Sequence, residues 1–356
     1  MKKSLLATTA LAALGVATVA APASAEGFEL KIGGFMEQWF GYTDSSSVDP
    51  NQDVFAQHSD NEIHFKGKQT LDNGLTIGFH IELEAESVSS TSDEVDEQYM
   101  TVEGSFGKII MGSENTAPYL MHYGAKNNGI GTEEGDSGAW AAGIDSALNT
   151  ANVAGGSMHD DDNSVTYISP RINGVQFGAS YVPEQGNTDS GSPNSAARAA
   201  NNKRDNGFGI AANYETSIAD MSLKVSAGYS DAGNDDSSSS TGDHTATQGA
   251  IQIGFGGFTV SAGYGEETKD DATRIDSNAI VTSLAYNAGP AGLSILYVRG
   301  EEDSVETKQD IVEFGASYAV GPGVTAKGSI YMWDKTVSAA KTAEGVAVAG
   351  GLVLSF

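Results

Sequence analysis

The stretch that decides the fold comprises residues 62–84, EIHFKGKQTLDNGLTIGFHIELE. Its second half places apolar side chains on one parity, at Leu75, Ile77, Phe79, Ile81 and Leu83. The other parity carries small or polar side chains, at Thr76, Gly78, His80, Glu82 and Glu84. Successive side chains of a strand point to opposite faces, so this pattern predicts a strand with one apolar and one polar face. The sequence LDNG at 71–74 predicts a tight turn before that strand.

The same alternation recurs along the chain, whereas helical periodicity is scarce. We find about sixteen such segments, with centres near residues 35, 66, 80, 100, 110, 166, 178, 211, 225, 251, 261, 283, 296, 314, 328 and 350. In the segment at 292–299 both parities carry apolar residues, and the pattern alone does not assign its faces. The chain is therefore expected to be all-β and to form one domain.

The connections between these segments are sorted by length. Seven are short and turn-like, at residues 71–74, 104–107, 170–173, 216–220, 256–257, 287–292 and 319–323. Eight longer polar loops separate them, so short and long connections are expected to alternate strictly. In an up-and-down sheet this puts all tight turns at one end and all long loops at the other. Such sorting is typical of an antiparallel transmembrane barrel with an even number of strands.

Aromatic residues stand near the ends of most predicted strands, at Trp39, Phe40, Tyr181, Tyr214, Tyr229, Tyr264, Tyr286, Tyr297, Tyr318, Tyr331, Trp333 and Phe356. Successive antiparallel strands would place these side chains at opposite rims, as two girdles at the boundary between lipid and water. Tyr331 and Trp333 do not fall on the outward parity of their predicted strand, so these two are not expected to face lipid.

The N-terminus indicates export. Lys2 and Lys3 precede an apolar stretch over residues 5–21, which is followed by Pro22 and the small residues Ala23, Ser24 and Ala25. This predicts a secretory signal peptide, residues 1–25, removed before folding. No later window resembles a membrane-spanning helix, so a membrane-spanning structure here would have to be a barrel.

Composition excludes several classes of function. The chain of 356 residues carries 47 Asp+Glu against 19 Lys+Arg, a net charge of -28, which argues against nucleic-acid binding. It has no cysteine, so zinc-thiolate sites and disulfides are excluded. No GxSxG, HExxH or phosphate-binding glycine loop occurs in its required strand-to-helix context, and we do not expect an enzyme.

The C-terminal segment, GVAVAGGLVLSF at 345–356, is an alternating strand that ends on Phe356. Such an ending looks like the signal read by the outer-membrane assembly machinery. Together with FELKIGGFMEQW at 28–39, residues 62–84 and the turn VEGSFGKIIMG at 102–112, it resembles the general diffusion porins of Gram-negative bacteria, those of alphaproteobacteria most closely. The resemblance implies a homotrimer of sixteen-stranded barrels in the outer membrane, in contact with lipid and lipopolysaccharide. It also implies that the third external loop folds inward and narrows a water-filled channel.

That loop corresponds to residues 115–162, a length that is uncommon for a structureless connection and usually functional. As a constriction it would present negative charge to the passage. We expect this charge from Glu133, Glu134, Asp136, Asp145, Asp160, Asp161 and Asp162. The alternative interpretation is a solvated acidic loop.

The resemblance also implies a basic wall opposite the acidic loop, and here the sequence departs from the family pattern. In many members arginines form that wall, but this chain has no arginine before Arg171. The early residues expected to face the pore are His64, Lys66, Lys68, His80, Glu82 and Glu84, accompanied by Glu62. Lys224 and Lys327 fall on the polar parity of later strands.

We expect passive diffusion of small hydrophilic solutes and ions, with a modest cation preference because carboxylates outnumber bases. A substrate-specific channel is the main alternative, and an adhesin-like barrel is a further one. No cofactor is expected. Acidic loops such as residues 231–244 could hold a structural Ca²⁺, although no EF-hand spacing occurs.

Overall fold

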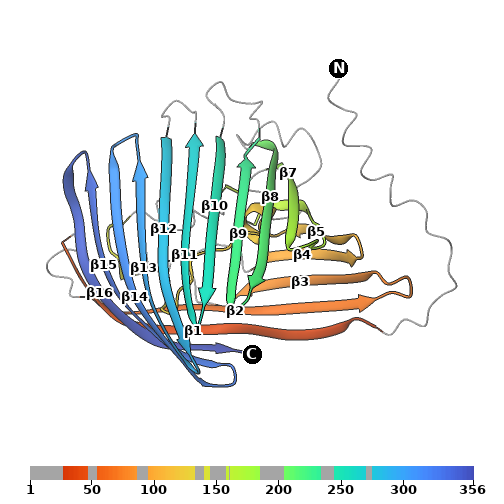
Figure 1. Ribbon diagram of the computed structural model, residues 1–356, viewed down its shortest axis with the longest axis horizontal. Helices are drawn as coiled ribbons and strands as arrows, with labels where there is room; N and C mark the ends of the chain where they lie inside the picture. Colours follow the sequence, from red (N-terminus) through yellow and green to blue (C-terminus); the bar gives the residue numbers. More distant parts are fainter. Residues whose placement is uncertain are drawn as a thin grey trace.

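The computed structural model describes residues 27–46, 54–85, 95–132, 140–144, 158–159, 161–184, 204–233, 244–269 and 275–356. In this part of the chain the strands form one closed antiparallel barrel of up-and-down topology (Figure 1). The fold class expected from the sequence is therefore confirmed. Within the described residues no helix combines the length and the apolar character needed to cross a bilayer. The predicted signal peptide, residues 1–25, lies outside the described residues.

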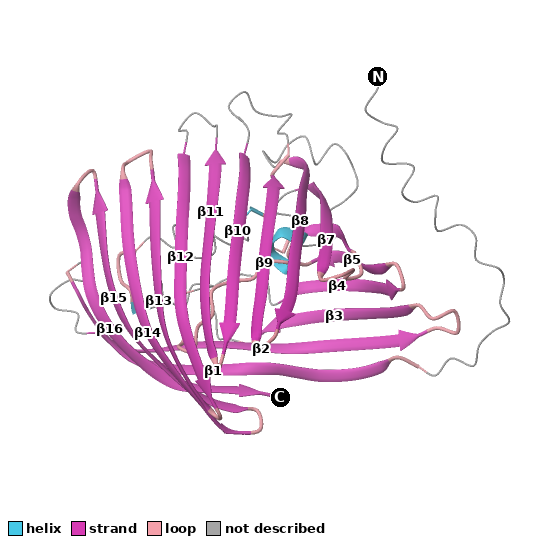
Figure 2. Cartoon of the chain, viewed as in Figure 1, coloured by secondary structure: helices cyan, strands magenta, loops and turns pink. Residues whose placement is uncertain are grey.

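The barrel contains sixteen strands in the described residues, and each predicted centre falls inside one of them. The strands are β1 (Glu29–Ser45), β2 (Val54–Thr70), β3 (Thr76–Glu84), β4 (Val95–Gly104), β5 (Gly107–Ser113), β6 (Asn163–Ile168), β7 (Val175–Glu184), β8 (Asp205–Ile218), β9 (Met221–Asp231), β10 (His244–Phe255), β11 (Phe258–Lys269), β12 (Ile275–Ala288), β13 (Ala291–Glu302), β14 (Thr307–Gly321), β15 (Val324–Val337) and β16 (Ala340–Ser355). One short helix, α1 (Ala117–Leu120), lies behind β8 and β9 in the view of Figure 2.

The barrel closes where β1 pairs with β16, in register from Phe35 and Ser355 to Ser45 and Gly345. Beyond the last paired strand residue, the N–H of Gly34 donates to the carbonyl of Phe356 at 3.0 Å, and the N–H of Phe356 donates to the carbonyl of Gly34 at 3.1 Å. Closure of this kind leaves no strand edge unpaired, which is the condition for a sheet to cross hydrocarbon.

The two faces of the wall differ as the alternation predicts. On β11, Phe258, Val260 and Tyr264 are 49%, 54% and 43% exposed, whereas Ser261 between them is buried. The apolar parity therefore faces outward. The polar parity faces the interior, where the residues of the long loop cover part of it.

Most of the predicted girdle residues are exposed on the outer face: Phe40, Tyr181, Tyr214, Tyr264, Tyr286, Tyr318 and Phe356. Trp39 is an exception, and its assignment to a girdle is wrong. It shares the inward parity of Glu37 and Thr43 and is fully buried inside the barrel. Tyr331 and Trp333, which fail the parity test, are likewise buried on the inner face.

The strict alternation of short and long connections is also wrong, because two of the expected long loops are tight turns. Only Asp303–Glu306 separates β13 from β14, and Ser338 with Ala339 separates β15 from β16. Ser338 and Ala339 adopt φ angles of 48° and 64°, the left-handed conformation that matches the twist of a two-residue hairpin. These strands extend further than their patterns indicate, so the connections at the loop end are short along β13 to β16.

Candidate channel constriction and its wall

After β5 the chain enters the barrel and follows its inner wall. Five backbone N–H groups of the described loop residues donate to serine hydroxyls of the wall. They are Ala117 to Ser180 at 2.8 Å, Tyr123 to Ser226 at 3.0 Å, Lys126 to Ser261 at 3.2 Å, Asn128 to Ser294 at 2.9 Å and Ile130 to Ser329 at 2.7 Å. These five serines, the serine ladder, lie on β7, β9, β11, β13 and β15. Each satisfies a backbone donor that the loop could not pair within itself.

The even-numbered strands between them bind loop carbonyls or amides. The side-chain amide of Asn213 on β8 donates to the carbonyl of Met121 at 3.0 Å. On β10, Gln248 and Gln252 donate to the carbonyls of Pro118 and Gly124. Inward-facing side chains of neighbouring strands therefore fix the path of the loop along the wall.

The second half of the described loop packs on an apolar region of the inner wall. Trp39, Ile130, Trp140, Leu296, Val298, Ile311, Tyr331 and Trp333 form one buried cluster. Polar ends of its aromatic side chains bond the loop backbone, as Trp333 Nε1 donates to the carbonyl of Ala142 at 3.1 Å. This cluster explains the apolar residues on both parities at 292–299. Leu293 and Ile295 face outward, and Leu296 and Val298 lie beneath the loop.

Of the acidic residues predicted for the constriction, Glu133, Glu134, Asp136, Asp145 and Asp160 lie outside the described residues. The structure places Asp161 and Asp162 where the loop returns to the wall. Asp162 Oδ2 lies 3.2 Å from His159 Nδ1, and both side chains are buried. Asp161 Oδ1 accepts a hydrogen bond from Asn115 Nδ2 at 3.1 Å. The contact between Asn115 and Asp161 joins the two ends of the loop. A constriction lined by the acidic residues stays a prediction.

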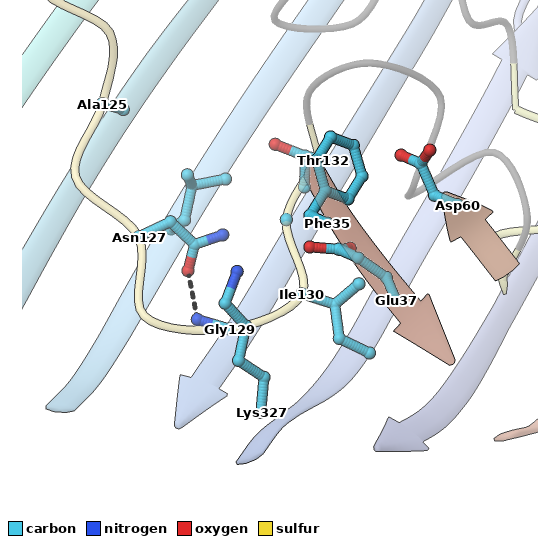
Figure 3. A pocket seen from close by; sticks show the side chains of 11 residues that line it. Phe35, Glu37, Asp60, Ala125, Asn127, Gly129, Ile130, Thr132 and Lys327 are labelled. Atoms are coloured by element: carbon cyan, nitrogen blue, oxygen red, sulfur yellow. Dashed lines mark hydrogen bonds between the residues drawn. The ribbon is translucent and has the colours of Figure 1, made fainter. Parts of the chain in front are cut away.

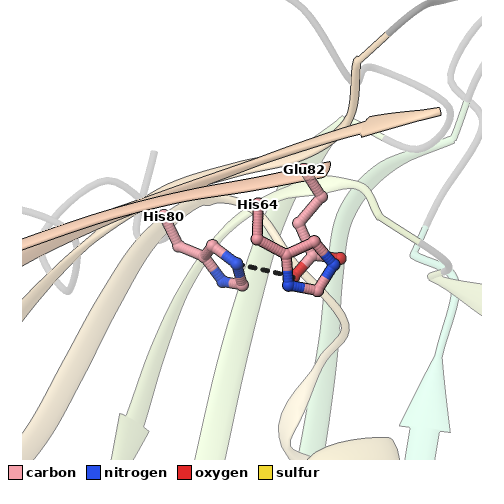
Figure 4. A group of neighbouring side chains, drawn as sticks. All are labelled: His64, His80 and Glu82. Atoms are coloured by element: carbon pink, nitrogen blue, oxygen red, sulfur yellow. Dashed lines mark ion pairs between the residues drawn. The ribbon is translucent and has the colours of Figure 1, made fainter. Parts of the chain in front are cut away.

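The six predicted wall residues lie on β2 and β3, on the parity that faces the interior. The register pairs His64 with Glu82, and Lys66 with His80. His64, His80 and Glu82 are in contact, as Figure 4 shows, with His80 Nε2 2.8 Å from Glu82 Oε1. Lys66 and Lys68 are exposed.

Sequence reasoning missed the next residues of this wall. Glu97 on β4 and Glu114, just after β5, are both bonded to Asn115: its side-chain amide donates to Glu97 Oε1 at 3.3 Å, and its backbone N–H donates to Glu114 Oε1 at 3.0 Å. Burial raises the pKa of the Glu114 carboxyl. The parity of β4 was the signal that could have found Glu97, while nothing local in the sequence points to Glu114.

A cavity lies between the loop and the wall where β1, β2 and β15 contribute charged residues. Glu37, Asp60 and Lys327 line it together with Asn127 and Gly129 of the loop (Figure 3). The polar parity predicted for Lys327 is therefore confirmed. Acidic and basic groups from opposite ends of the sequence meet beside the loop at this place.

A second basic group lies near the turn between β6 and β7. Arg171 Nε is 3.0 Å from Glu215 Oε1, and Lys224 Nζ is 3.9 Å from Glu215 Oε2. Lys224 also lies over the ring of Tyr123 in the loop, 5.1 Å from its centroid. In the described residues Arg171 and Lys224 share the carboxylate of Glu215, and the contact between Lys224 and Tyr123 attaches the loop to this group.

An apolar exterior, a closed wall, a charged interior and a loop bound within it together define a transmembrane channel barrel. Residues 7–336 match the family model described as Gram-negative porin, and the chain belongs to this family. Members of this family are outer-membrane channels, not enzymes. No curated protein matches the sequence at a significant level.

Solved structures with the same fold share little sequence with this chain. The anion-selective porin from Comamonas acidovorans superposes with a TM-score of 0.64 at 11% identity, covering 93% of this chain and 100% of that one. The in-vitro folded trimer form of OmpT from Vibrio cholerae gives 0.61 at 15% identity over 93% and 100% of the two chains. A mutant of the Rh. blastica porin gives 0.55 at 15% identity over 92% and 100%. At these identities the likeness concerns the fold alone.

Proposed function

We propose that the barrel lets small hydrophilic solutes and ions diffuse passively across the outer membrane, with a modest preference for cations. The observation that supports the preference is the concentration of carboxylates on the inner faces of β1 to β4, where Glu37, Asp60, Glu62, Glu82 and Glu97 lie. Charge lining a pore sets its selectivity, and salt screens the effect over about 10 Å at 0.1 M.

The fold does not determine the sign of selectivity, since the Comamonas acidovorans porin of the same fold is described as anion-selective. Side chains must determine it. Lys66, Lys68 and Lys327 offset part of the negative charge of these carboxylates, so the cation preference is expected to be small and to fade as salt rises.

Reversal potentials in planar bilayers under a KCl gradient test this proposal. We expect the sign of a cation-preferring channel at 0.1 M, and a smaller potential for the double variant Glu37→Gln, Asp60→Asn. Anion preference of the unmodified protein would refute the selectivity and leave the diffusion channel intact.

Liposome swelling with sugars of graded size separates general diffusion from a substrate-specific channel. A smooth decline of rate with size supports general diffusion, and saturation by one sugar supports the alternative. Burial of Trp39, Tyr331 and Trp333 of the wall, in one cluster with Trp140 of the loop, favours the first result, because these rings do not form a track open to solutes.

We further propose that the chain assembles as a homotrimer among outer-membrane lipid and lipopolysaccharide, and that the assembly machinery recognises Phe356. Phe356 is 68% exposed at the seam between β1 and β16, so its ring is free to contact a partner. The solved trimer form of OmpT, which has the same fold, supports the proposed homotrimer. Deleting Phe356 should lower the amount of folded protein in the outer membrane, and light scattering of the purified protein should give three chains per particle.

A structural Ca²⁺ in the acidic loops stays a proposal. Most of residues 231–244 lie outside the described residues. Asp231 Oδ1, which is described, accepts the backbone N–H of Gly233 at 2.8 Å. Calorimetric titration with Ca²⁺ tests this proposal, and no heat of binding would refute it.

A further inference from the structure

Two histidines and a glutamate converge on the inner face of β2 and β3 (Figure 4). His80 and Glu82 are two residues apart on β3 and share a face, and His64 lies opposite Glu82 in register. His80 Nε2 is 2.8 Å, and His64 Nδ1 3.7 Å, from Glu82 Oε1. Strand geometry therefore brings three donor atoms within 4.8 Å of one another.

The second nitrogen of each imidazole is held by another side chain. His64 Nε2 lies 2.7 Å from Glu62 Oε2, and with its proton on Nε2 the imidazole donates to this carboxyl and keeps Nδ1 as a metal ligand. His80 Nδ1 lies 2.6 Å from the hydroxyl of Tyr99. Metal-binding histidines characteristically use the second ring nitrogen in this way, which fixes the tautomer and the ring orientation.

These outer contacts turn lone pairs toward Glu82. The Tyr99 hydroxyl is also hydrogen-bonded to Glu114, so the tyrosine oxygen can accept a hydrogen bond from the N–H at His80 Nδ1. His80 Nε2 then presents a lone pair to a carboxylate oxygen at 2.8 Å, and His64 Nδ1 does the same from the other side. Three acceptors that face each other repel, and a cation between them, either a metal ion or a proton on His80 Nε2, removes this repulsion.

We infer that His64 Nδ1, His80 Nε2 and Glu82 bind a divalent transition-metal ion of the Zn²⁺ class on the channel wall. Two nitrogens and one oxygen suit Zn²⁺ and Co²⁺, whereas Ca²⁺ and Mg²⁺ prefer oxygen ligands throughout. Metal–ligand bonds near 2.0–2.1 Å put the ligands of a tetrahedral ion about 3.4 Å apart. The observed separations of 2.8 and 3.7 Å lie on either side of that value.

The site is open to ions from the channel. The side chains of His64, His80 and Glu82 are 15%, 10% and 13% exposed, so water from the inner side can reach them and supply a fourth ligand. A second group of carboxylates, Glu62, Glu84 and Asp96, lies beside it and attracts cations to this part of the wall. Bound metal would add two positive charges to the acidic wall and reduce cation preference. This last consequence alone rests on the proposed channel function.

Titration of the full-length folded barrel in detergent with Co²⁺ and with Zn²⁺ tests the site. We expect one ion per chain, with the intense visible absorption of tetrahedral Co²⁺ and its displacement by Zn²⁺ but not by excess Ca²⁺. The double variant His64→Ala, His80→Ala should lose at least about 100-fold in affinity. Glu62→Gln removes a positioning residue and should lose about 10–100-fold, as outer-shell substitutions do.

His58→Ala is the matched control, because His58 lies on β2 with the same parity as His64 but outside the cluster. It should bind like the unmodified protein. Circular dichroism establishes that every variant is folded. The inference is overturned if the folded protein gives no Co²⁺ absorption, if the double variant binds as well as the unmodified protein, or if His58→Ala loses as much. Ion binding without measurable conductance would refute the channel proposal and not the site.

Discussion

The backbone N–H of Gly131 donates to the Glu313 carboxylate at 3.1 Å, joining the loop to β14 across 182 positions of sequence. The same carboxylate accepts from the side chain of Asn127 at 2.6 Å and from the hydroxyl of Ser329. Glu313 is completely buried. A buried acid that accepts three hydrogen bonds fixes the part of the loop nearest the cavity at Lys327.

Glu313→Ala should detach this part of the loop. Each buried donor left without a partner costs about 1–3 kcal/mol, so residues 127–131 should become accessible. Limited proteolysis in detergent and the variance of single-channel current measure the effect. Glu301→Ala is the control, since Glu301 makes an ion pair with Lys308 at 3.5 Å where both side chains are partly exposed. Equal behaviour of the two variants would contradict the anchoring role.

Gly41→Ala should disturb the apolar cluster under the loop. An added Cβ would lie 2.4 Å from Cζ3 of Trp140 and 2.8 Å from the carbonyl oxygen of Val348. Overpacking of this kind costs about 1–3 kcal/mol, and we expect a lower unfolding temperature in detergent. Gly249→Ala is matched to it, because the nearest atom to its added Cβ is 3.5 Å away. A normal unfolding temperature for Gly41→Ala would show that Trp140 moves freely.

Acid should release the segment of the loop around His122. Burial lowers the pKa of His122 to about 4, and the segment lies outside the membrane-spanning strands. In a detached loop the pKa would be near 6.5, so the detached state takes up the proton first as pH falls. The free energy that attaches this segment to the wall is therefore unaffected above pH 6.5. It weakens between pH 6.5 and 4, by at most about 3 kcal/mol. Hydrogen exchange of residues 117–126 measures this, and His122→Leu should remove the pH dependence contributed by this group.

Lys327→Ala should raise cation preference. Lys327 lines the cavity with Glu37 and Asp60, and a unit charge acting over about 8 Å in water contributes roughly 0.5 kcal/mol, or about a two-fold change in permeability ratio. Reversal potentials at 0.1 M KCl measure the change. Lys308→Ala serves as control because Lys308 has the outward parity on β14. A shift of the same size in both variants would indicate a surface effect instead of a pore effect.

The strands could be predicted from the sequence because their outer faces meet lipid, and that environment imposes apolar alternation on every strand. The path of the loop could not. Ser226, Ser261 and Ser294 bind loop amides, yet a serine that faces water on a channel wall would give the same pattern. The girdle assignment of Trp39 was wrong because this residue lies inside the barrel, in the same buried cluster as Trp140 of the loop. From the sequence alone, an aromatic residue buried under a loop cannot be told from one that faces lipid.

The wall residues were predicted in part. Parity placed His64, His80 and Glu82 on one inner surface, and register then brought them into contact. Glu114 depends on how the chain turns inward after β5, a tertiary feature without a local signal. The tight turn at Ser338 and Ala339 escaped prediction because neither residue is a glycine or asparagine, the usual residues for positive φ.

The serine ladder has a mechanical consequence. A closed sheet can flatten into an ellipse with little loss of its own hydrogen bonds, because neighbouring strands only pivot slightly against each other. A segment tied at five strands in succession, from Ser180 to Ser329, acts as a belt along the inner wall, and a change in the angles between these strands would pull its ties apart. Lateral pressure from the bilayer is therefore borne partly by the loop, so cutting its ties should soften the cross-section of the whole cylinder.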